Sequence, residues 1–341
     1  MKAAIFREVG SPLSIETIPD PTPGPNELIL KVARCGICGS DLHATEDGLM
    51  TLPAGSVMGH EFAGEVAAIG PDVSGWKEGQ LVTALPFISC GGCAACHRGD
   101  SLRCTSIIST GLGQNHGAYA EFVRIGTNDT IALPASVNVT EGALIEPLAV
   151  GFHAVEMARL SAGANVLILG AGPVGLAVAL FARFAGARNI IVSEPSASRA
   201  ALAAKMGATD AITDRKDIGA QYRKLANGAQ PDVIFECVGV PGMIGEAINL
   251  APRGGRIVIV GVCAKPDQFL PLPAIMKELQ LQFVLAYRKG DFELIAHLLA
   301  GDRIDPSPML TRTVGFDDFP SAFEGLRQPQ DQCKIMLDPW Q

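Results

Sequence analysis

The chain has 341 residues, of which 48% are hydrophobic and 6% aromatic, and its formal net charge at pH 7 is -8. This length predicts a large core that is divided between two domains. The acidic charge argues against nucleic acid as a partner, because a polyanion attracts basic rather than acidic surfaces.

The first part of the chain, residues 1–150, is expected to be mostly β-structure. Short apolar runs such as ELILKVARCG, EFAGEVAAIG and QLVTAL are separated there by glycine and proline. Runs of this length between turn-forming residues are typical of strands. The opening residues, MKAAIFREVG, contain charges and no apolar stretch like that of a signal peptide, so we expect a cytoplasmic protein.

A candidate metal site lies early in this part. The run CGICGSDLH begins at Cys35, and His60 and Glu61 follow it. A lone histidine would more often pack in a core or a loop. A cysteine, a histidine and a carboxylate together suit a zinc site that keeps one position for water or substrate. We therefore predict an open zinc site at Cys38, His60 and Glu61.

Four further cysteines have the spacing Cys-x2-Cys-x2-Cys-x7-Cys, at Cys90, Cys93, Cys96 and Cys104. Such short spacers allow four sulfurs to converge at about 2.3 Å from one Zn²⁺, and a site filled by thiolates stabilises the fold without catalysing a reaction. A disulfide cluster, an iron–sulfur site and unlinked thiols are the alternatives. The odd total of nine cysteines and the expected reducing cytosol favour structural zinc.

The next feature is an uncharged segment, 161–182, that is as long as a membrane span. Glycines and a proline interrupt it, so we expect a strand and then a helix, and no membrane partner.

The same segment contains the motif Gly170-x-Gly172-x-x-Gly175, directly after an apolar run. In such a motif the first glycine makes a tight turn, the second lets the backbone approach a pyrophosphate, and the third lets the helix pack on the strand. The pyrophosphate would lie at the helix N-terminus. We predict a dinucleotide site at Gly170, Gly172, Pro173, Val174 and Gly175.

Two charged residues after this motif bear on the choice of cofactor. Glu194 lies 19 residues beyond Gly175, at the tip of the next apolar run. A carboxylate at this point accepts hydrogen bonds from the adenosine ribose, which favours NAD over NADP. Arg199 follows in the next helical pattern, either as a solvated residue or as a second contact to adenosine.

Strands and helices alternate from residue 151 onward. The candidate strands are 166–169, 190–193, 211–213, 232–236, 256–260 and 281–285. Patterns such as GLAVALFARFAG and SRAALAAKMG, each ended by a glycine, predict helices between them. This alternation predicts a doubly wound parallel sheet, the dinucleotide-binding domain, over 151–289. The last segment, 290–341, does not extend such a sheet simply, so we assign it to the first domain.

Taken in order, these motifs resemble the zinc-dependent medium-chain dehydrogenase family, in the branch of sorbitol, threonine and butanediol dehydrogenases. CGICGSDLH, GHEFAGEV, the four cysteines, IEPLAVGFHA, GAGPVG and KIMLDP extend the resemblance over essentially the whole chain. It implies an α/β fold, with a Rossmann sheet and a mostly-β GroES-like catalytic domain that carries a structural zinc lobe. It also implies an oxidoreductase that transfers hydride between a secondary alcohol or polyol and NAD, with two Zn²⁺ per chain.

The resemblance assigns the ligands of the catalytic zinc. It implies that Cys38 and His60 bind the metal, and that Glu61 is a ligand or an alternating one. Glu146 stands where other branches place a cysteine ligand, so it is expected to bind zinc or to hold its water. Cys35 is then a buried bystander.

The same resemblance implies a route for the proton. Asp41 corresponds to the carboxylate that orients the ligand histidine. Ser40 and His43 correspond to the relay that passes the alcohol proton through the cofactor ribose to solvent. In the mechanism that the resemblance implies, zinc polarises the substrate oxygen and the nicotinamide takes the hydride.

The chain departs from the polyol branch at one position. That branch has an arginine near the end of the sixth strand of the cofactor domain, thought to interact with the active-site glutamate. Here Ala286 takes its place and Arg288 follows two positions later. The loop 43–58, expected to line the substrate pocket, mixes polar and apolar residues. The substrate itself is therefore not identified by the sequence.

Two other function classes compete with a dehydrogenase. A non-catalytic, redox-sensing protein that binds zinc and nucleotide would not need the relay residues Ser40 and His43. A zinc-ribbon protein that binds nucleic acid conflicts with the acidic charge. The apolar run LQLQFVLAY, 279–287, would form an edge strand, which invites pairing with a second copy. The family resemblance implies dimers joined at these edges, paired again into homotetramers.

Overall fold

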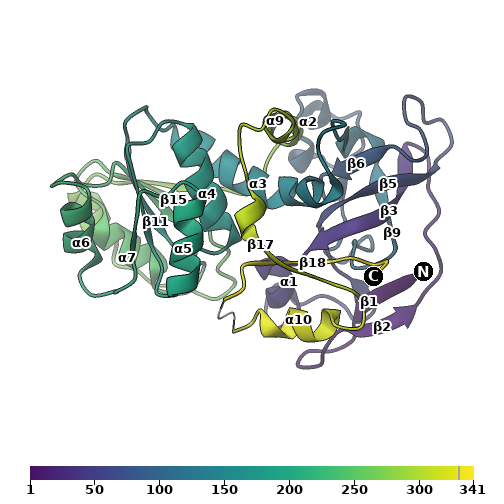
Figure 1. Ribbon diagram of the computed structural model, residues 1–341, viewed down its shortest axis with the longest axis horizontal. Coiled ribbons are helices and arrows are strands. Elements are labelled where there is room, and N and C mark those ends of the chain that lie inside the picture. The colour runs from purple at the N-terminus through teal and green to yellow at the C-terminus, as the bar shows by residue number, and fades with distance from the viewer. Residues whose placement is uncertain (329–330) are drawn as a thin grey trace. The chain divides into compact units, whose positions relative to one another are not determined.

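The computed structural model describes residues 1–328 and 331–341, and the chain forms two compact units (Figure 1). The β-rich unit comprises Met1–Glu146, Tyr287–Arg303 and Leu310–Gln341. The α/β unit comprises Pro147–Ala286 and Ile304–Met309. The division expected at 150/151 falls inside helix α3 (Val139–Ala158), and the observed division lies in the same helix, between Glu146 and Pro147.

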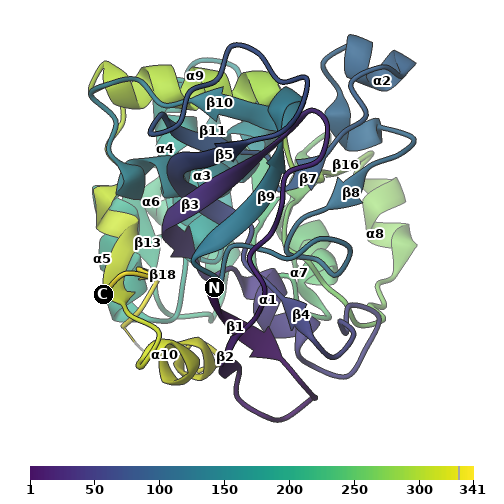
Figure 2. The same cartoon turned by 90° about the vertical axis from the view of Figure 1, so that its right-hand side faces the viewer.

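The β-rich unit is built on a seven-stranded sheet in the order β10-β6-β5-β3-β18-β17, with β9 also paired to β3. Figure 2 shows β3, β5 and β9 side by side. Two smaller sheets, β2-β1-β4 and β7-β8, complete the unit. Its strands are β1 (Lys2–Phe6), β2 (Ser14–Thr17), β3 (Glu27–Gly36), β4 (Ser56–Val57), β5 (Glu61–Ile69), β6 (Leu81–Ala84), β7 (Phe87–Ile88), β8 (Ile108–Ser109), β9 (Phe122–Gly126), β10 (Thr130–Ala132), β17 (Leu310–Val314) and β18 (Lys334–Leu337).

Short helices and one long one connect these strands. They are α1 (Gly39–Ala44), α2 (Ala94–His97), α9 (Lys289–Ala300), α10 (Phe319–Gly325) and the 3-10 turns η1 (Ser101–Arg103) and η2 (Thr127–Asp129). Tyr119, Phe319 and Phe323 are buried in one apolar core with residues of β1, β3 and β18. The C-terminal segment therefore completes the core of the β-rich unit. Burial of its aromatic rings contributes much of the stability of this core.

The α/β unit contains a six-stranded sheet, and every neighbouring pair in it is parallel. The order is β13-β12-β11-β14-β15-β16, the doubly wound arrangement that the alternating pattern predicts. The strands are β11 (Asn165–Leu169), β12 (Asn189–Ser193), β13 (Asp210–Ile212), β14 (Val233–Glu236), β15 (Arg256–Ile259) and β16 (Gln280–Phe283). All six expected strands are confirmed to within two residues.

Helices lie on both faces of this sheet: α4 (Pro173–Phe184) and α5 (Ala197–Lys205) on one, α6 (Ile218–Leu225) and α7 (Met243–Leu250) on the other (Figure 1). The apolar residues of α6 and α7 share a core with one face of the strands. The glycines expected to end α4 and α5 have left-handed backbones, with φ of +82° at Gly186 and +99° at Gly207. A side chain would be strained there, which explains where the helices end.

Residues 304–309 belong to the α/β unit, although the sequence suggested that everything after 290 returns to the first domain. The 3-10 turn η3 (Ser307–Met309) contacts α5, so tertiary packing decides this assignment. In the part of the chain that the structure describes, no helix is both long and apolar enough to cross a membrane.

Candidate active site

The predicted open metal site forms where two antiparallel strands meet. Gly36, at the end of β3, pairs with Glu61, at the start of β5, and Cys38 is the N-cap of α1. Cys38, His60 and Glu61 each offer a ligand atom, and these three atoms all lie within 4.8 Å of one another. Donors about 2.0–2.3 Å from one zinc ion are separated by less than this. The structure therefore brings these three predicted ligands together in one unit.

A glycine makes this approach possible. Gly59, directly before His60, has φ +97°, and a Cβ there would lie only 2.8 Å from the Cys35 sulfur and from the Tyr119 nitrogen. Any side chain at this position would be strained and would push the histidine away from the site. Cys35 itself is fully buried, as expected of a bystander.

Asp41 lies behind the histidine, away from solvent. One of its carboxylate oxygens is 3.2 Å from Nδ1 of His60. The other accepts hydrogen bonds from the Tyr119 hydroxyl at 2.5 Å and from the Cys38 amide at 3.2 Å. Burial alone would lower the pKa of His60, but the charges of Asp41 and Cys38 raise it well above its ordinary value. Asp41 is thus placed to orient the imidazole, with Tyr119 as a partner that the sequence did not reveal.

Glu61 has a second partner, the lysine of the KIMLDP motif, to which the sequence assigned no role. Lys334, on β18, donates to both of its carboxylate oxygens at 2.6 Å and also to the carbonyl of Ile37 at 2.9 Å. Both side chains are 1% exposed. Burial opposes the charge of Lys334, yet Glu61 and Cys38 raise its pKa above the ordinary value. A buried carboxylate without this lysine would be left with an uncompensated charge.

Glu146 is not a member of the three-ligand cluster. It lies in α3, is 6% exposed, and accepts a 2.6 Å hydrogen bond from the hydroxyl of Tyr287. Burial raises the pKa of Glu146 to about 7. Tyr287 follows Ala286, which stands at the arginine position of the polyol branch, whereas the Arg288 amide begins α9 by donating to Asp291. The hydroxyl of Tyr287 therefore contacts the glutamate in this chain.

The predicted relay residues both lie on α1. The hydroxyl of Ser40 is 3.5 Å from Nε2 of His60, on the side of the imidazole that does not face Asp41. His43 is one helical turn further along, 39% exposed, with its Nδ1 3.5 Å from a carboxylate oxygen of Glu46. Residues three apart share a helix face. A short helix thus connects the buried cluster to the surface of the β-rich unit.

The four cysteines of the second predicted site also converge. Their ligand atoms lie within 4.8 Å of one another, with sulfur–sulfur distances of 3.5 Å for Cys93–Cys96 and 4.0 Å for Cys90–Cys96. Four sulfurs about 2.3 Å from one tetrahedral centre are about 3.8 Å apart. Backbone amides of Cys96 and Thr105 lower the pKa of Cys93 to about 5. Burial and the Cys93 sulfur raise that of Cys96 to about 11.

In the α/β unit, the glycine motif has the expected local form. β11 ends at Leu169, Gly170 has φ +95°, and Gly172 is the N-cap of α4 with Pro173 in its first turn. Glu194, at the end of β12, is 5% exposed. Its two carboxylate oxygens accept the amides of Ala171 at 2.9 Å and Ser196 at 3.0 Å. The carboxylate therefore links the glycine turn to the start of α5, which contains Arg199.

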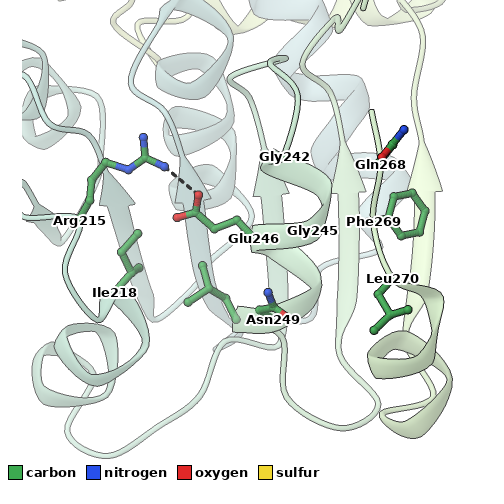
Figure 3. Close-up of a pocket in the computed structure, with 10 residues that line it drawn as sticks. Arg215, Ile218, Gly242, Gly245, Glu246, Asn249, Gln268, Phe269 and Leu270 are labelled. Carbon is green, nitrogen blue, oxygen red and sulfur yellow. Dashed lines mark hydrogen bonds and ion pairs between the residues drawn. The ribbon is translucent and has the colours of Figure 1, made fainter. Parts of the chain in front are cut away.

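A separate groove of the α/β unit, about 540 Å³ in volume, lies beside α7 (Figure 3). Arg215 and Glu246 form an ion pair of 2.7 Å at one side, and Phe269 and Leu270 lie at the other. None of the predicted cofactor residues lines this groove, so it is distinct from the glycine site.

Comparisons with known proteins match both units. The family model described as alcohol dehydrogenase GroES-like domain covers residues 24–135, and the one described as zinc-binding dehydrogenase covers 173–301. Sorbitol dehydrogenase of Bacillus subtilis is 32% identical over 99% of this chain and 97% of its own length. L-threonine 3-dehydrogenase of Saccharopolyspora erythraea is 32% identical over 99% of both chains.

Solved structures agree with these matches. The crystal structure of 2R,3R-butanediol dehydrogenase from Bacillus subtilis has a TM-score of 0.88 at 30% identity, over 99% of both chains. A zinc-binding dehydrogenase from Sinorhizobium meliloti, bound to NADP, has a TM-score of 0.85 at 30% identity, also over 99% of both chains. These likenesses confirm the predicted combination of a GroES-like domain with a Rossmann domain.

Proposed function

Since the chain belongs to the zinc-binding dehydrogenase family, we propose that this zinc-dependent oxidoreductase transfers hydride between a secondary alcohol or polyol and NAD. The observation that carries this proposal is the convergence of Cys38, His60 and Glu61 within 4.8 Å, next to the hydroxyl of Ser40. A thiolate, an imidazole and a carboxylate suit a zinc site that keeps a position for substrate.

The residues around this cluster fit a catalytic metal. Cys38 and His60 would hold it, with Glu61 and Glu146 as carboxylates that alternate or hold its water. When bound, zinc would supply a Lewis acid for the substrate oxygen and the nicotinamide would supply the hydride acceptor. Asp41 orients the imidazole so that Nε2 is left for the metal, and Lys334 balances the charge of Glu61.

A proton must leave the alcohol during oxidation, and α1 supplies its path. The Ser40 hydroxyl, 3.5 Å from Nε2 of His60, would accept the proton of the substrate oxygen while it donates its own proton onward. His43, one helical turn further along and 39% exposed, would hold this proton on its imidazole and release it to solvent. The glycine motif and Glu194 would hold the cofactor in the α/β unit, with the pyrophosphate at the start of α4.

The test is a panel of sorbitol, L-idonate, 2R,3R-butanediol and L-threonine, each assayed with NAD⁺ and with NADP⁺. Formation of the reduced nicotinamide is followed by its absorbance at about 340 nm. A secondary alcohol or polyol should be oxidised with kcat/KM in the range of about 10⁴ M⁻¹s⁻¹ or above. Absence of turnover over a wide panel by the zinc-loaded protein would refute the proposal.

A non-catalytic redox sensor is the less favoured function. Such a protein has no use for Ser40 and His43 on one helix beside the metal ligands, and the curated relatives named above are dehydrogenases. None of the nine cysteines, all of which the structure describes, is in a disulfide. We propose a reducing, cytoplasmic environment for this protein, because clustered cysteines bind metal there and do not form disulfides.

We expect Tyr287→Phe to impair catalysis without unfolding the protein. It removes the 2.6 Å hydrogen bond to Glu146 and leaves a buried carboxylate without that donor, which costs about 1–3 kcal/mol. The carboxylate then loses its fixed orientation, and kcat/KM should fall by about tenfold, or about 1.4 kcal/mol. Steady-state kinetics and thermal unfolding measure both effects.

The matched control is Tyr222→Phe in the α/β unit. Tyr222 is also buried, but its hydroxyl has no hydrogen-bond partner among the described residues. Loss of the Tyr222 hydroxyl should leave kcat/KM unchanged. Equal kinetics for both variants would contradict the role given to Tyr287.

We also propose that the protein is a homo-oligomer built through β16. This strand is at the edge of its sheet, and exposed apolar side chains surround it on β16, on α8 (Pro271–Met276) and on the flanking loops. They are Leu270 (67%), Leu272 (56%), Ile275 (68%), Met276 (58%), Phe283 (61%) and Leu285 (72%). An exposed strand edge with apolar side chains around it pairs readily with the same edge of a second copy, which gives a dimer. Two such dimers would pair again into a tetramer.

Light scattering should therefore give the mass of a dimer or tetramer at micromolar concentration. The double variant Phe283→Lys with Leu285→Lys should shift the protein to monomers, because charges would be buried at the interface. Leu49→Lys is the control, since Leu49 is 93% exposed in the β-rich unit and belongs to no such cluster. A monomeric unmutated protein would contradict this assembly.

A further inference from the structure

Arg327, just after α10, donates hydrogen bonds to the end of the helix that holds the predicted relay. One guanidinium nitrogen donates to the carbonyl of Leu42 at 3.2 Å and to Glu46 at 3.1 Å. Another donates to the hydroxyl of Thr45 at 2.7 Å. These acceptors are the carbonyl just before His43 and two side chains just after Ala44, the last residue of α1.

The guanidinium is itself held from the other side. Glu324, on α10, accepts from Nε at 2.7 Å and from the second terminal nitrogen at 3.2 Å, a bidentate pair. The guanidinium carbon lies 5.8 Å from the ring centre of Phe323, a residue of the buried core. A planar guanidinium that donates hydrogen bonds on both sides holds its partners in one relative orientation, which the ammonium group of a lysine does not do. Arg327 therefore ties α1 to α10.

Glu46 extends this contact to the imidazole. One carboxylate oxygen accepts from Arg327, and the other is 3.5 Å from Nδ1 of His43. The negative charge of this carboxylate, 3.5 Å away, attracts the positive end of an N–H bond and repels a nitrogen lone pair, so the contact favours the neutral tautomer that carries its proton on Nδ1. The Nε2 lone pair is then left free to take a proton. The charged groups that face His43 through these contacts are Glu46 and, behind it, Arg327 and Glu324.

We infer that Arg327 and Glu46 are positioning residues for proton transfer: Arg327 holds the C-terminal end of α1 and Glu46 sets the tautomer and orientation of His43. This inference rests on the proposed function, because it assigns His43 to the proton path. Neither residue contacts the metal ligands in the described structure, so their effect acts through His43 and not through the metal cluster.

The first measurement is of the imidazole itself. The chain has six histidines, and the ¹⁵N signals of His43 are those missing in His43→Gln. In the zinc-loaded protein, at a pH where the imidazole is neutral, the ¹⁵N shifts should show mainly the tautomer protonated on Nδ1. Arg327→Ala and Glu46→Gln should shift them to the averaged pattern of a free imidazole. Unchanged signals in both variants would overturn the inference, whether or not the enzyme turns over.

The second measurement is hydride transfer in single turnovers with NAD⁺ and 2R,3R-butanediol. A positioned proton acceptor contributes about 10²–10⁴ in rate, so the single-turnover rate should fall about a hundredfold in His43→Gln and about tenfold in Arg327→Ala and Glu46→Gln. The diol concentration that gives half of the maximal single-turnover rate should stay nearly constant. Arg327→Lys should recover little, because it lacks the fork. Arg312→Ala is the control, since Arg312 makes one exposed ion pair with Asp318 in the same unit.

The outcomes separate the two levels of the argument. If His43→Gln transfers hydride at the unmutated rate, the proton path of the proposed function fails, and the ¹⁵N signals alone decide on Glu46 and Arg327. If His43→Gln is slow while Arg327→Ala and Glu46→Gln are not, the proton path stands and the inference is wrong. Glu46 is 46% exposed, so Glu46→Gln keeps the test valid even where Arg327→Ala weakens the fold.

Discussion

Cys38→Ser should yield a folded protein that contains about one zinc ion per chain in place of about two, and that has no measurable turnover. The reason is the position of Cys38 as the N-cap of α1, within 4.8 Å of the ligand atoms of His60 and Glu61. Loss of this sulfur removes one donor of the open site and leaves the four-cysteine site intact. Metal analysis, circular dichroism and steady-state kinetics measure the three quantities.

Cys93→Ser should have the opposite signature. Its sulfur lies 3.5 Å from that of Cys96 within the four-cysteine cluster, so its loss should release the other zinc ion. Structural zinc in small domains contributes about 10–16 kcal/mol to folding, and a lobe attached to a larger core should lose a part of this. We expect a fall in the unfolding temperature of about 5 °C or more, since about 1 kcal/mol shifts it by several degrees.

Cys263→Ser is the control for both variants. Cys263 is outside both clusters, in the α/β unit, and its sulfur donates to the carbonyl of Lys265. This substitution should change neither zinc content nor activity nor stability. If Cys38→Ser and Cys93→Ser lost activity and fold to the same extent, the division into one catalytic and one structural metal would be wrong.

Cofactor preference is the second large effect, and we expect NAD to exceed NADP by roughly two orders of magnitude in kcat/KM. Glu194 stands at the tip of β12, and its buried carboxylate is bonded to the glycine turn through the amide of Ala171. A 2′-phosphate next to this group meets repulsion of the order of a kcal/mol or more at intermediate dielectric. Ribose hydroxyls would instead donate charge-assisted hydrogen bonds to it. Each difference of about 1.4 kcal/mol is tenfold.

Glu194→Gln separates the charge from the shape of this site. The amide oxygen of the glutamine still accepts one backbone hydrogen bond, but the charge that repels a 2′-phosphate is gone. The preference for NAD⁺ over NADP⁺ should therefore narrow, mainly because kcat/KM for NADP⁺ increases. Glu194→Ala should narrow it too, but with a loss for both cofactors, because the amides of Ala171 and Ser196 lose their acceptor. Comparable kcat/KM for NAD⁺ and NADP⁺ in the unmutated enzyme would refute the assignment.

Arg199 is the counter-argument, because an arginine close to the ribose accommodates a 2′-phosphate. It lies inside α5, after the N-cap Ser196, and not at the strand tip. Arg199→Ala should therefore leave kcat/KM for NAD⁺ nearly unchanged. The solved relatives differ in this respect, since one was crystallised with NADP and another, the rspB dehydrogenase of Escherichia coli, with NADH.

The sequence by itself determined the features that depend on short stretches of chain. The parallel sheet follows from the regular alternation of strands and helices between Asn165 and Phe283, and the glycine turn needs only β11, Gly170 and the start of α4. The four cysteines lie within 15 residues, so their spacing alone restricts the geometry to a small lobe. In each case the physical constraint is local: backbone conformation, the reach of a loop, or the length of a strand.

Only the tertiary structure decided which distant side chains surround the candidate active site. Lys334 bonds Glu61 from 273 positions away, Tyr287 bonds Glu146 from 141, and Arg327 reaches Glu46 from 281. A lysine in an apolar strand and single tyrosines carry no spacing signal, because their partners are set by which strands of a sheet are neighbours. Buried carboxylates need such partners whatever their place in the sequence, since an unpaired charge away from water is strongly destabilising.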